Sequence, residues 1–207
     1  DTGLDNISGF ENVIGGDGND TLIGDEGNNR LIGGAGDDQI QAFGGNDVID
    51  GGEGIDSVSF EDSEEAVTID LGAGTVSGVG TGTDTISGVE NISTGSGDDT
   101  VTADGRANII ATGAGDDVVE GAGGDDTLDG GTGVDTISFE NAEEGVAVDL
   151  ESGSAHGDDT GVDTFRAFEN VTGGRGDDII TGDGLNNVLI GNRGSDVLDG
   201  GAGNDRL

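Results

Sequence analysis

The sequence predicts an all-β fold, a right-handed parallel β-roll (a β-helix-like solenoid) of stacked nonapeptide repeats. One nine-residue word, Gly-Gly-x-Gly-x-Asp-x-U-x with U a large aliphatic residue, recurs in phase along the chain. Because the aliphatic residue returns only once per word, the period does not fit an amphipathic helix. Glycine-rich stretches separate these aliphatic positions. Each word therefore fits a short strand followed by a tight turn.

The words form three arrays separated by two related spacers, and we expect residues 1–207 to be one continuous repeat region. The arrays are residues 15–59, 94–138 and 173–207, and the spacers are residues 60–93 and 139–172. The third array stops one residue short of a complete word. Phe60 and Phe139 open the two spacers at equivalent places, so arrays and spacers repeat together. Repetition at two levels is typical of a solenoid.

The strands are expected around position 8 of each word, because the aliphatic residues stand there. The first array supplies Leu22, Leu31, Ile40, Ile49 and Val58. Side chains alternate along a strand, so position 8 should point inward while positions 7 and 9 point outward. Two words make one coil, and words i and i+2 should lie above one another. Two parallel sheets would then enclose a thin aliphatic core, with Phe60, Phe139, Phe165 and Phe168 filling it at the spacers.

Glycines at positions 2 and 4 are expected to shape the turns. Glycine reaches positive φ without a Cβ penalty and lets neighbouring backbones approach closely. The turns should therefore present carbonyl oxygens. The glycines that we expect at the binding loops are Gly16, Gly18, Gly34, Gly36, Gly95, Gly97, Gly113, Gly115, Gly174 and Gly176.

Position 6 places a carboxylate in almost every turn. The residues are Asp20, Asp38, Asp47, Asp56, Asp99, Asp117, Asp126, Asp135, Asp178, Asp196 and Asp205. Carboxylate and carbonyl oxygens are the ligands of a hard cation that accepts six to eight of them, which indicates Ca²⁺. The chain has no Cys and a single His, His156, so nothing in it favours a zinc or copper site.

These words resemble the RTX family, the repeats-in-toxin or haemolysin-type calcium-binding modules of secreted bacterial proteins. The resemblance implies that each Ca²⁺ lies between the turns of words i and i+2. It implies the pairs Asp20 with Asp38, Asp38 with Asp56, Asp99 with Asp117, Asp117 with Asp135, and Asp178 with Asp196. With the three pairs that contain an asparagine at position 6, one ion per stacked pair gives roughly eight ions.

The second word of each array departs from the pattern, since it carries an amide at position 6. These residues are Asn29, Asn108 and Asn187. An amide oxygen can ligate but brings no charge, so we expect weaker sites where they face Asp47, Asp126 and Asp205. Degenerate words before each array hold Asp5, Asp84 and Asp163, and whether these bind metal stays open. The aspartates at positions 5 and 9, and Glu64, Glu65, Glu143 and Glu144, are expected on solvated surfaces.

The charge agrees with a metal-dependent fold. The chain has 6 Lys plus Arg against 45 Asp plus Glu, a formal net charge of −39, with 30% hydrophobic and 3% aromatic residues. Such a composition normally indicates disorder. We therefore expect folding and calcium binding to be one event. Extracellular modules bind Ca²⁺ with dissociation constants of roughly 10⁻⁴ to 10⁻³ M, so the chain should fold outside the cell.

The expected function is calcium binding by a module that assists secretion, folding and stability of a larger secreted bacterial protein. The resemblance implies type I secretion, and we expect an extracellular or cell-surface location. Two alternatives stay open: a rigid spacer of a surface-layer or adhesin protein, and an accessory module of a secreted protease, lipase or polysaccharide-modifying enzyme. We expect no catalytic residues, no membrane insertion and no nucleic-acid partner, because the charge has the wrong sign for nucleic acid. The oligomeric state is left open.

Overall fold

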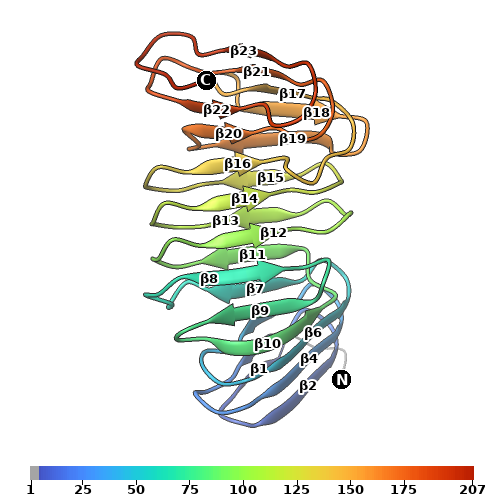
Figure 1. Cartoon of the computed structure of the whole chain (residues 1–207). Coiled ribbons are helices and arrows are strands. Elements are labelled where there is room, and N and C mark those ends of the chain that lie inside the picture. Colours follow the sequence, from blue (N-terminus) through green and yellow to red (C-terminus); the bar gives the residue numbers. More distant parts are fainter. Residues whose placement is uncertain (1–4) are drawn as a thin grey trace. The chain divides into compact units, whose positions relative to one another are not determined.

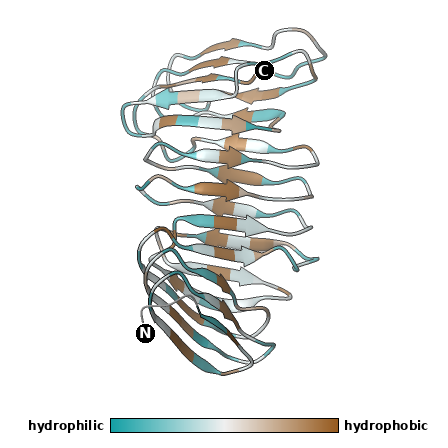
Figure 2. Ribbon diagram, turned by 180° about the vertical axis from the view of Figure 1, so that it is seen from behind, coloured by the Kyte–Doolittle hydropathy of each residue, from teal (hydrophilic) through white to brown (hydrophobic). Residues whose placement is uncertain are grey.

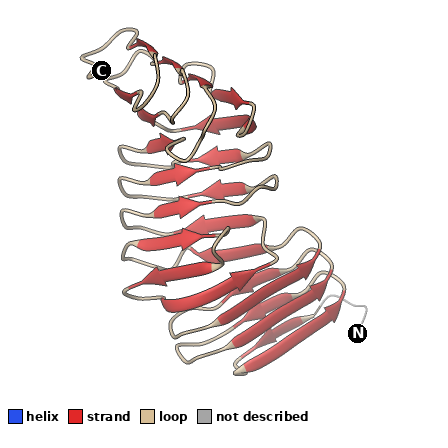
Figure 3. Ribbon diagram, turned by 45° about the vertical axis from the view of Figure 1, so that its right-hand side comes forward, coloured by secondary structure: helices blue, strands red, loops and turns tan. Residues whose placement is uncertain are grey.

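The structure, a computed structural model, describes residues 5–207 and consists of strands and turns without a helix in that range. Figure 3 shows strands and connecting loops alone in the described part. The chain divides into two compact units, one ending at Thr100 and the other covering Val101–Leu207. No helix that is long and apolar enough to cross a membrane occurs among the described residues.

The first unit contains strands of two sheets, and successive strands alternate between them except in the spacer, where three consecutive strands lie in one sheet (Figure 1). One has the order β1-β3-β5-β7-β11 and the other the order β2-β4-β6-β10-β9-β8. The strands are β1 (Asn6–Ser8), β2 (Asn12–Asp17), β3 (Thr21–Ile23), β4 (Arg30–Ala35), β5 (Gln39–Gln41), β6 (Val48–Glu53), β7 (Ser57–Phe60), β8 (Val67–Asp70), β9 (Thr75–Gly78), β10 (Gly82–Ser87) and β11 (Asn91–Thr94).

The second unit is built in the same way. Its strand orders are β13-β15-β19-β18-β17-β21-β23 and β12-β14-β16-β20-β22. The strands are β12 (Thr100–Thr102), which begins at the last residue of the first unit, β13 (Ile109–Ala111), β14 (Val118–Glu120), β15 (Thr127–Asp129), β16 (Thr136–Ser138), β17 (Val146–Asp149), β18 (Ser154–Gly157), β19 (Gly161–Arg166), β20 (Asn170–Thr172), β21 (Ile179–Thr181), β22 (Val188–Ile190) and β23 (Val197–Asp199).

Within the arrays, neighbouring strands of a sheet are parallel and come from every second word. Leu22 pairs with Ile40, and Leu31 pairs with Ile49. In the second unit Ile110 pairs with Leu128. Each of these pairs joins position 8 of one word to position 8 of the next word but one, so words i and i+2 lie above one another. The predicted all-β, parallel β-roll is confirmed.

The core of each unit is the column of aliphatic residues from position 8. Leu22, Leu31 and Ile49 are almost fully buried, and the predicted core residues Phe60, Phe139, Phe165 and Phe168 are buried as well. The rings of Phe165 and Phe168 meet edge to face with centroids 5.9 Å apart, a favourable geometry for aromatic pairs. Figure 2 shows the hydrophobic residues in short segments along the strands.

The spacers add antiparallel strands that the nonapeptide pattern does not predict. In the first unit β8, β9 and β10 form an antiparallel meander, and β10 then pairs in parallel with β6. In the second unit β17, β18 and β19 do the same, and β19 pairs in parallel with β15. Each spacer therefore inserts a hairpin and returns the chain to the roll in register.

Close backbone approach explains the turn glycines. Gly16 and Gly34 have φ values of 120° and 122°, and a Cβ on Gly34 would collide with the carbonyl oxygen of Gly16. Three other predicted glycines, Gly95, Gly174 and Gly176, are not among the positive-φ residues. A Cβ at any of these three positions would instead meet the backbone of the preceding spacer at less than 3.0 Å. Glycine is therefore required there by space and not by φ.

Candidate metal centre

The position-6 side chains line the inside of the turns. Most are buried although they carry charge: Asp20, Asp38, Asp47, Asp56, Asp99, Asp117, Asp126, Asp135 and Asp178. Asn29, Asn108 and Asn187 are buried too, while Asp196 and Asp205 are partly exposed in the last turns. Charged side chains are rarely buried without a partner, so these positions need compensation.

One oxygen of each carboxylate holds two stacked turns together. The backbone N–H of Asp20 donates to Oδ1 of Asp38 at 2.7 Å, and the N–H of Asp38 donates to Oδ1 of Asp56 at 2.8 Å. In the second unit the N–H of Asp117 donates to Asp135 at 2.9 Å, and the N–H of Asp178 donates to Asp196 at 3.0 Å. The structure thus brings these predicted pairs together, while the pair of Asp99 with Asp117 has one member in each unit and stays a prediction.

The words with an amide at position 6 are joined to the following coil by the same kind of ladder. The N–H groups of Asn29, Asn108 and Asn187 donate to Oδ1 of Asp47, Asp126 and Asp205 at 2.8, 2.8 and 3.0 Å respectively. Asp84 and Asp163, which the sequence left open, extend it. They accept the N–H groups of Asp47 and Asp126 at 2.9 and 3.1 Å. Asp5 is joined to the first ladder through its N–H, which donates to Asp20 at 2.8 Å.

The second carboxylate oxygen has a different environment. In eight of these side chains Oδ2 is buried and has no hydrogen-bond partner: Asp20, Asp38, Asp47, Asp56, Asp84, Asp126, Asp135 and Asp163. A buried carboxylate oxygen without a partner is costly, since the group has lost its water. A cation beside these oxygens would remove that cost.

Backbone carbonyls converge on the same oxygens. Oδ2 of Asp20 and the carbonyl oxygen of Gly33 both lie closer than 3.0 Å to the point where a Cβ on Gly15 would be. In the same way, Oδ2 of Asp38 and the carbonyl oxygen of Gly51 both lie closer than 3.0 Å to the point where a Cβ on Gly33 would be. The position-1 glycine therefore makes room for a carboxylate and a carbonyl oxygen from successive coils. We had expected glycines only at positions 2 and 4 in this role, and the frequent glycine at position 1 is the signal that we missed.

The donor set suits a hard cation that takes many backbone ligands. Among residues 5–207 no three His, Cys, Asp or Glu side chains gather into a group that could hold a metal on their own. Carbonyl oxygens from the turns must therefore supply much of any coordination. Ca²⁺ accepts such mixed sets of carboxylate and carbonyl oxygens, whereas zinc and copper prefer nitrogen and sulfur.

Comparison with protein families identifies the repeat. The model of the RTX calcium-binding nonapeptide repeat matches residues 5–40, 23–58, 102–137 and 172–207, which together are more than half of the chain. The chain belongs to the RTX calcium-binding repeat family. RTX repeats bind Ca²⁺, so calcium is the ion that fits the buried oxygens. A search of curated proteins finds no match to this RTX chain.

Burial raises the pKa of several carboxylates in the RTX turns. The pKa of Asp56 and of Asp135 rises to about 6, first because the carboxyl is buried and also because neighbouring carboxylates repel its charge. The pKa of Asp126 rises to about 7, and that of Asp84 and Asp163 to about 6, again mainly through burial. In each case a backbone N–H bond opposes the rise. Without metal, the charged form is therefore disfavoured in these turns.

In RTX words with asparagine at position 6, the asparagine side chain forms hydrogen bonds within its own word. Oδ1 of Asn29 accepts the N–H of Asp25 at 2.8 Å, and its Nδ2 donates back to Asp25 at 3.3 Å. Asn187 makes the same pair of bonds with Asp183, at 3.0 and 3.2 Å. The amide oxygen is already used inside its own word. This arrangement agrees with our expectation of weaker sites there, which stays a prediction.

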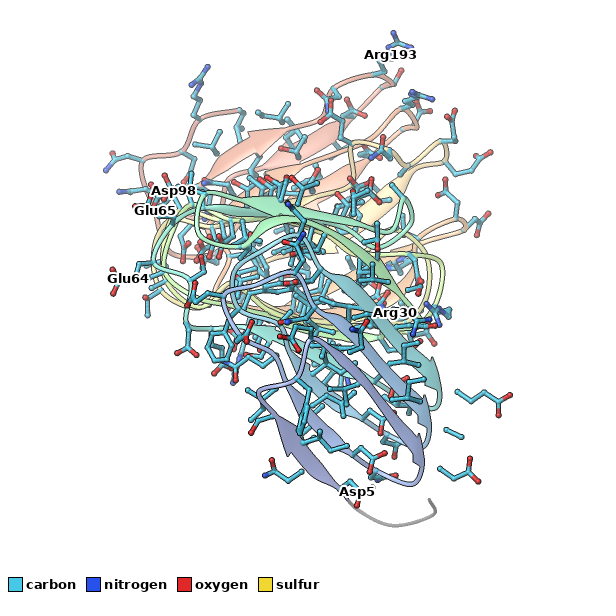
Figure 4. All side chains as sticks on the ribbon, turned by 90° about the horizontal axis from the view of Figure 1, so that it is seen from below. Asp5, Arg30, Glu64, Glu65, Asp98 and Arg193 are labelled. Carbon is cyan, nitrogen blue, oxygen red and sulfur yellow. The ribbon has the colours of Figure 1, made fainter. Side chains whose placement is uncertain are left out.

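The position-5 side chains form a second ladder on the outside of the turns. Asp37, Asp116, Asp125 and Asp177 are exposed, and each accepts a backbone N–H from the next coil at 2.8 to 3.0 Å. Glu64 and Glu65 lie on an exposed turn, as predicted (Figure 4). Position 5 thus contributes to stacking without lining the buried turn.

Proposed function

We propose that this RTX chain folds on binding Ca²⁺ outside the cell and serves as the secretion, folding and stabilising module of a larger secreted protein. The observation that carries the proposal is the set of buried, unpartnered Oδ2 atoms in a chain of net charge −39. A fold that buries such oxygens needs a cation to become stable. Position-6 carboxylates and turn carbonyls would hold the ion, which supplies the missing positive charge.

The cost of burying many carboxylates favours a fold that forms only when calcium binds over a fold with a preformed metal site. Removing a carboxylate from water costs several kcal/mol unless an opposite charge compensates it, roughly as in a buried ion pair. Here many such groups share two thin edges, and they repel one another as well as losing water. Because each nonapeptide word adds only one aliphatic side chain to the core, apolar burial in the arrays offsets little of this. Metal-binding free energy then becomes folding free energy.

Calcium-coupled folding would leave the chain unfolded inside the cell and folded outside it. Extracellular modules bind Ca²⁺ at roughly 10⁻⁴ to 10⁻³ M, far above the concentrations that cytosolic sensors detect. The chain would stay extended inside the cell, in a state that a narrow export channel can accept. It would become compact after export, and by resemblance the route is type I secretion. About eight ions per chain remains our proposal for the number of sites.

Sedimentation velocity tests this proposal. In a calcium chelator we expect an expanded chain with a high frictional ratio, and in 10 mM Ca²⁺ a compact monomer, with 10 mM Mg²⁺ giving no compaction. The contrast with Mg²⁺ follows because that ion demands octahedral geometry and gives up its water reluctantly. A chain that is equally compact in chelator and in Ca²⁺ would argue for a constitutive structural spacer.

A further inference from the structure

Each spacer ends in a short motif that lies outside the nonapeptide word. It reads Ser87-Gly88-Val89-Glu90-Asn91 in the first unit and Arg166-Ala167-Phe168-Glu169-Asn170 at the equivalent place in the second. In each unit the motif follows the last word of an array in the stack: Asn91 pairs with Ser57, and Asn170 pairs with Thr136. It therefore occupies the place where the next position-6 aspartate would stand.

The glutamate of this motif makes the hydrogen bond of a position-6 aspartate. The N–H of Asp56 donates to Oε2 of Glu90 at 3.0 Å, and the N–H of Asp135 donates to Oε2 of Glu169 at 2.9 Å. In return the carbonyl of Asp56 accepts the N–H groups of Glu90 and Asn91 at 3.1 and 2.9 Å. The turn is shorter than in a nonapeptide word, and the extra methylene of glutamate lets the carboxylate reach the same backbone group.

A carbonyl oxygen accompanies each glutamate. The carbonyl oxygen of Gly88 and Oδ2 of Asp56 both lie closer than 3.0 Å to the point where a Cβ on Gly51 would be. In the second unit the carbonyl oxygen of Ala167 lies closer than 3.0 Å to the point where a Cβ on Gly130 would be, and the side chain of Asp135 lies beside the same point. This repeats the arrangement of Gly33 beside Asp20.

The backbone of the motif is held in a left-handed conformation at this carbonyl. Gly88 has φ 61°, and Ala167 has φ 59° although it carries a Cβ. Such a conformation is costly for alanine and persists where the surroundings fix it. The left-handed turn is thus the same in both units despite the change of residue.

An independent observation indicates a ligand at both places. Oδ2 of Asp56 and Oδ2 of Asp135 are buried and unpartnered, and both residues have 0% relative exposure. Each belongs to the last word of an array, and the next strand in the stack is that of the spacer motif and not of another nonapeptide. Without the spacer motif, these two oxygens would have no carboxylate or carbonyl from a following coil.

We propose that Glu90 and Glu169 are calcium ligands that close an additional site at each junction between an array and the following spacer. The first site would use Asp56, the carbonyl of Gly88 and Glu90, and the second would use Asp135, the carbonyl of Ala167 and Glu169. The inference rests on the proposed calcium-dependent folding. Its consequence is that calcium fastens the spacers, and not only the repeats, into the roll.

Counting bound ions tests the junction sites. In equilibrium dialysis with atomic emission, the double variant E90Q/E169Q should bind two fewer Ca²⁺ ions per chain than the wild type, and each single variant one fewer. Glutamine keeps an oxygen that can accept the N–H of Asp56 or Asp135, so the turn hydrogen bond is retained. E11Q is the matched control, since Glu11 occupies the same place in a first copy of the motif but is exposed.

The outcomes separate the two proposals. A wild-type chain that binds no Ca²⁺ would overturn the proposed function itself. A wild type that binds Ca²⁺ while the double variant binds the same number with the same affinity would overturn the junction sites alone. If the double variant does not fold, crystals of the wild type grown in Ca²⁺ decide: an ion within about 2.3 to 2.6 Å of a Glu90 oxygen is expected. Filled array sites with no ion at Glu90 or Glu169 would overturn the inference.

Discussion

At the scale of single residues, the two oxygens of a buried position-6 carboxylate have different roles. Oδ1 of Asp38 accepts the N–H of Asp20 and so fixes the stacking of two turns. Oδ2 of Asp38 has no protein partner. The neighbouring Asp37 is exposed and uses its Oδ1 to accept the N–H of Ile55 at 2.9 Å. Adjacent aspartates thus face a buried site and the solvent respectively.

This difference predicts unequal effects of two alanine substitutions. Asp38→Ala removes a carboxylate between two stacked sites, so the calcium affinity of the chain should fall by roughly tenfold or more, the minimum expected when even an indirect metal contact is lost. Asp37→Ala removes only an exposed hydrogen bond and should change affinity much less. Isothermal titration calorimetry of both variants measures the contrast. Equal losses would show that the register of ligands is wrong.

The sequence predicts the place of a residue in the turns when that residue belongs to the nonapeptide word. The position-6 aspartates could be located from the sequence because the nonapeptide repeats in phase, and their role as metal ligands stays a prediction. Glu90 and Glu169 were not predicted as ladder residues, because they stand outside any nonapeptide word. Their recurrence at equivalent places of the two spacers, each time before an asparagine, is the signal that could have found them. The sequence alone does not show which backbone N–H each carboxylate oxygen accepts in the turns, and the structure was needed for this.

At the scale of elements, the unit of construction is a short strand followed by a glycine-rich turn. The aliphatic period predicts the strands and, with two words to a coil, the stacking of every second word. The antiparallel meanders β8–β10 and β17–β19 were not predicted. Their segments alternate over a few residues without any repeated word, so the sequence does not indicate which neighbour each strand will choose.

Turn glycines at close backbone contacts should be far less tolerant than glycines in open positions. Gly34→Ala would place a Cβ against the carbonyl of Gly16 at a residue with φ 122°, and should destabilise the calcium-bound chain by about 1 to 3 kcal/mol. Gly80→Ala is the control, because a Cβ there has no heavy atom within 4 Å. Urea unfolding in saturating Ca²⁺ measures both. A Gly34→Ala variant as stable as Gly80→Ala would contradict the described turn.

At the scale of the whole molecule, stability follows from the balance between a thin core and a net charge of −39. The pKa of Asp56 is raised from 3.8 to about 6, and that of Asp126 to about 7, mainly through burial. Protonation and calcium binding are two ways of neutralising the same groups. They should therefore compete.

This competition predicts opposite pH effects with and without calcium. A raised folded-state pKa contributes stability that is complete below about pH 4 and is lost as the pH rises through 6 to 7. The calcium-free chain should therefore gain compactness when the pH is lowered from 8 to 5, while the apparent affinity for Ca²⁺ should fall over the same range. Sedimentation and calcium titration at several pH values measure the two trends. Affinity that rises on acidification would contradict the assignment of these carboxylates as ligands.

The most direct test of calcium-coupled folding is far-UV circular dichroism during a calcium titration from chelator to 10 mM, with Mg²⁺ as the control ion. A cooperative gain of β-structure is expected between roughly 10⁻⁴ and 10⁻³ M Ca²⁺, with no such gain in Mg²⁺. A full β signal already present in chelator would contradict calcium-coupled folding, because the buried carboxylates would then be tolerated without a cation.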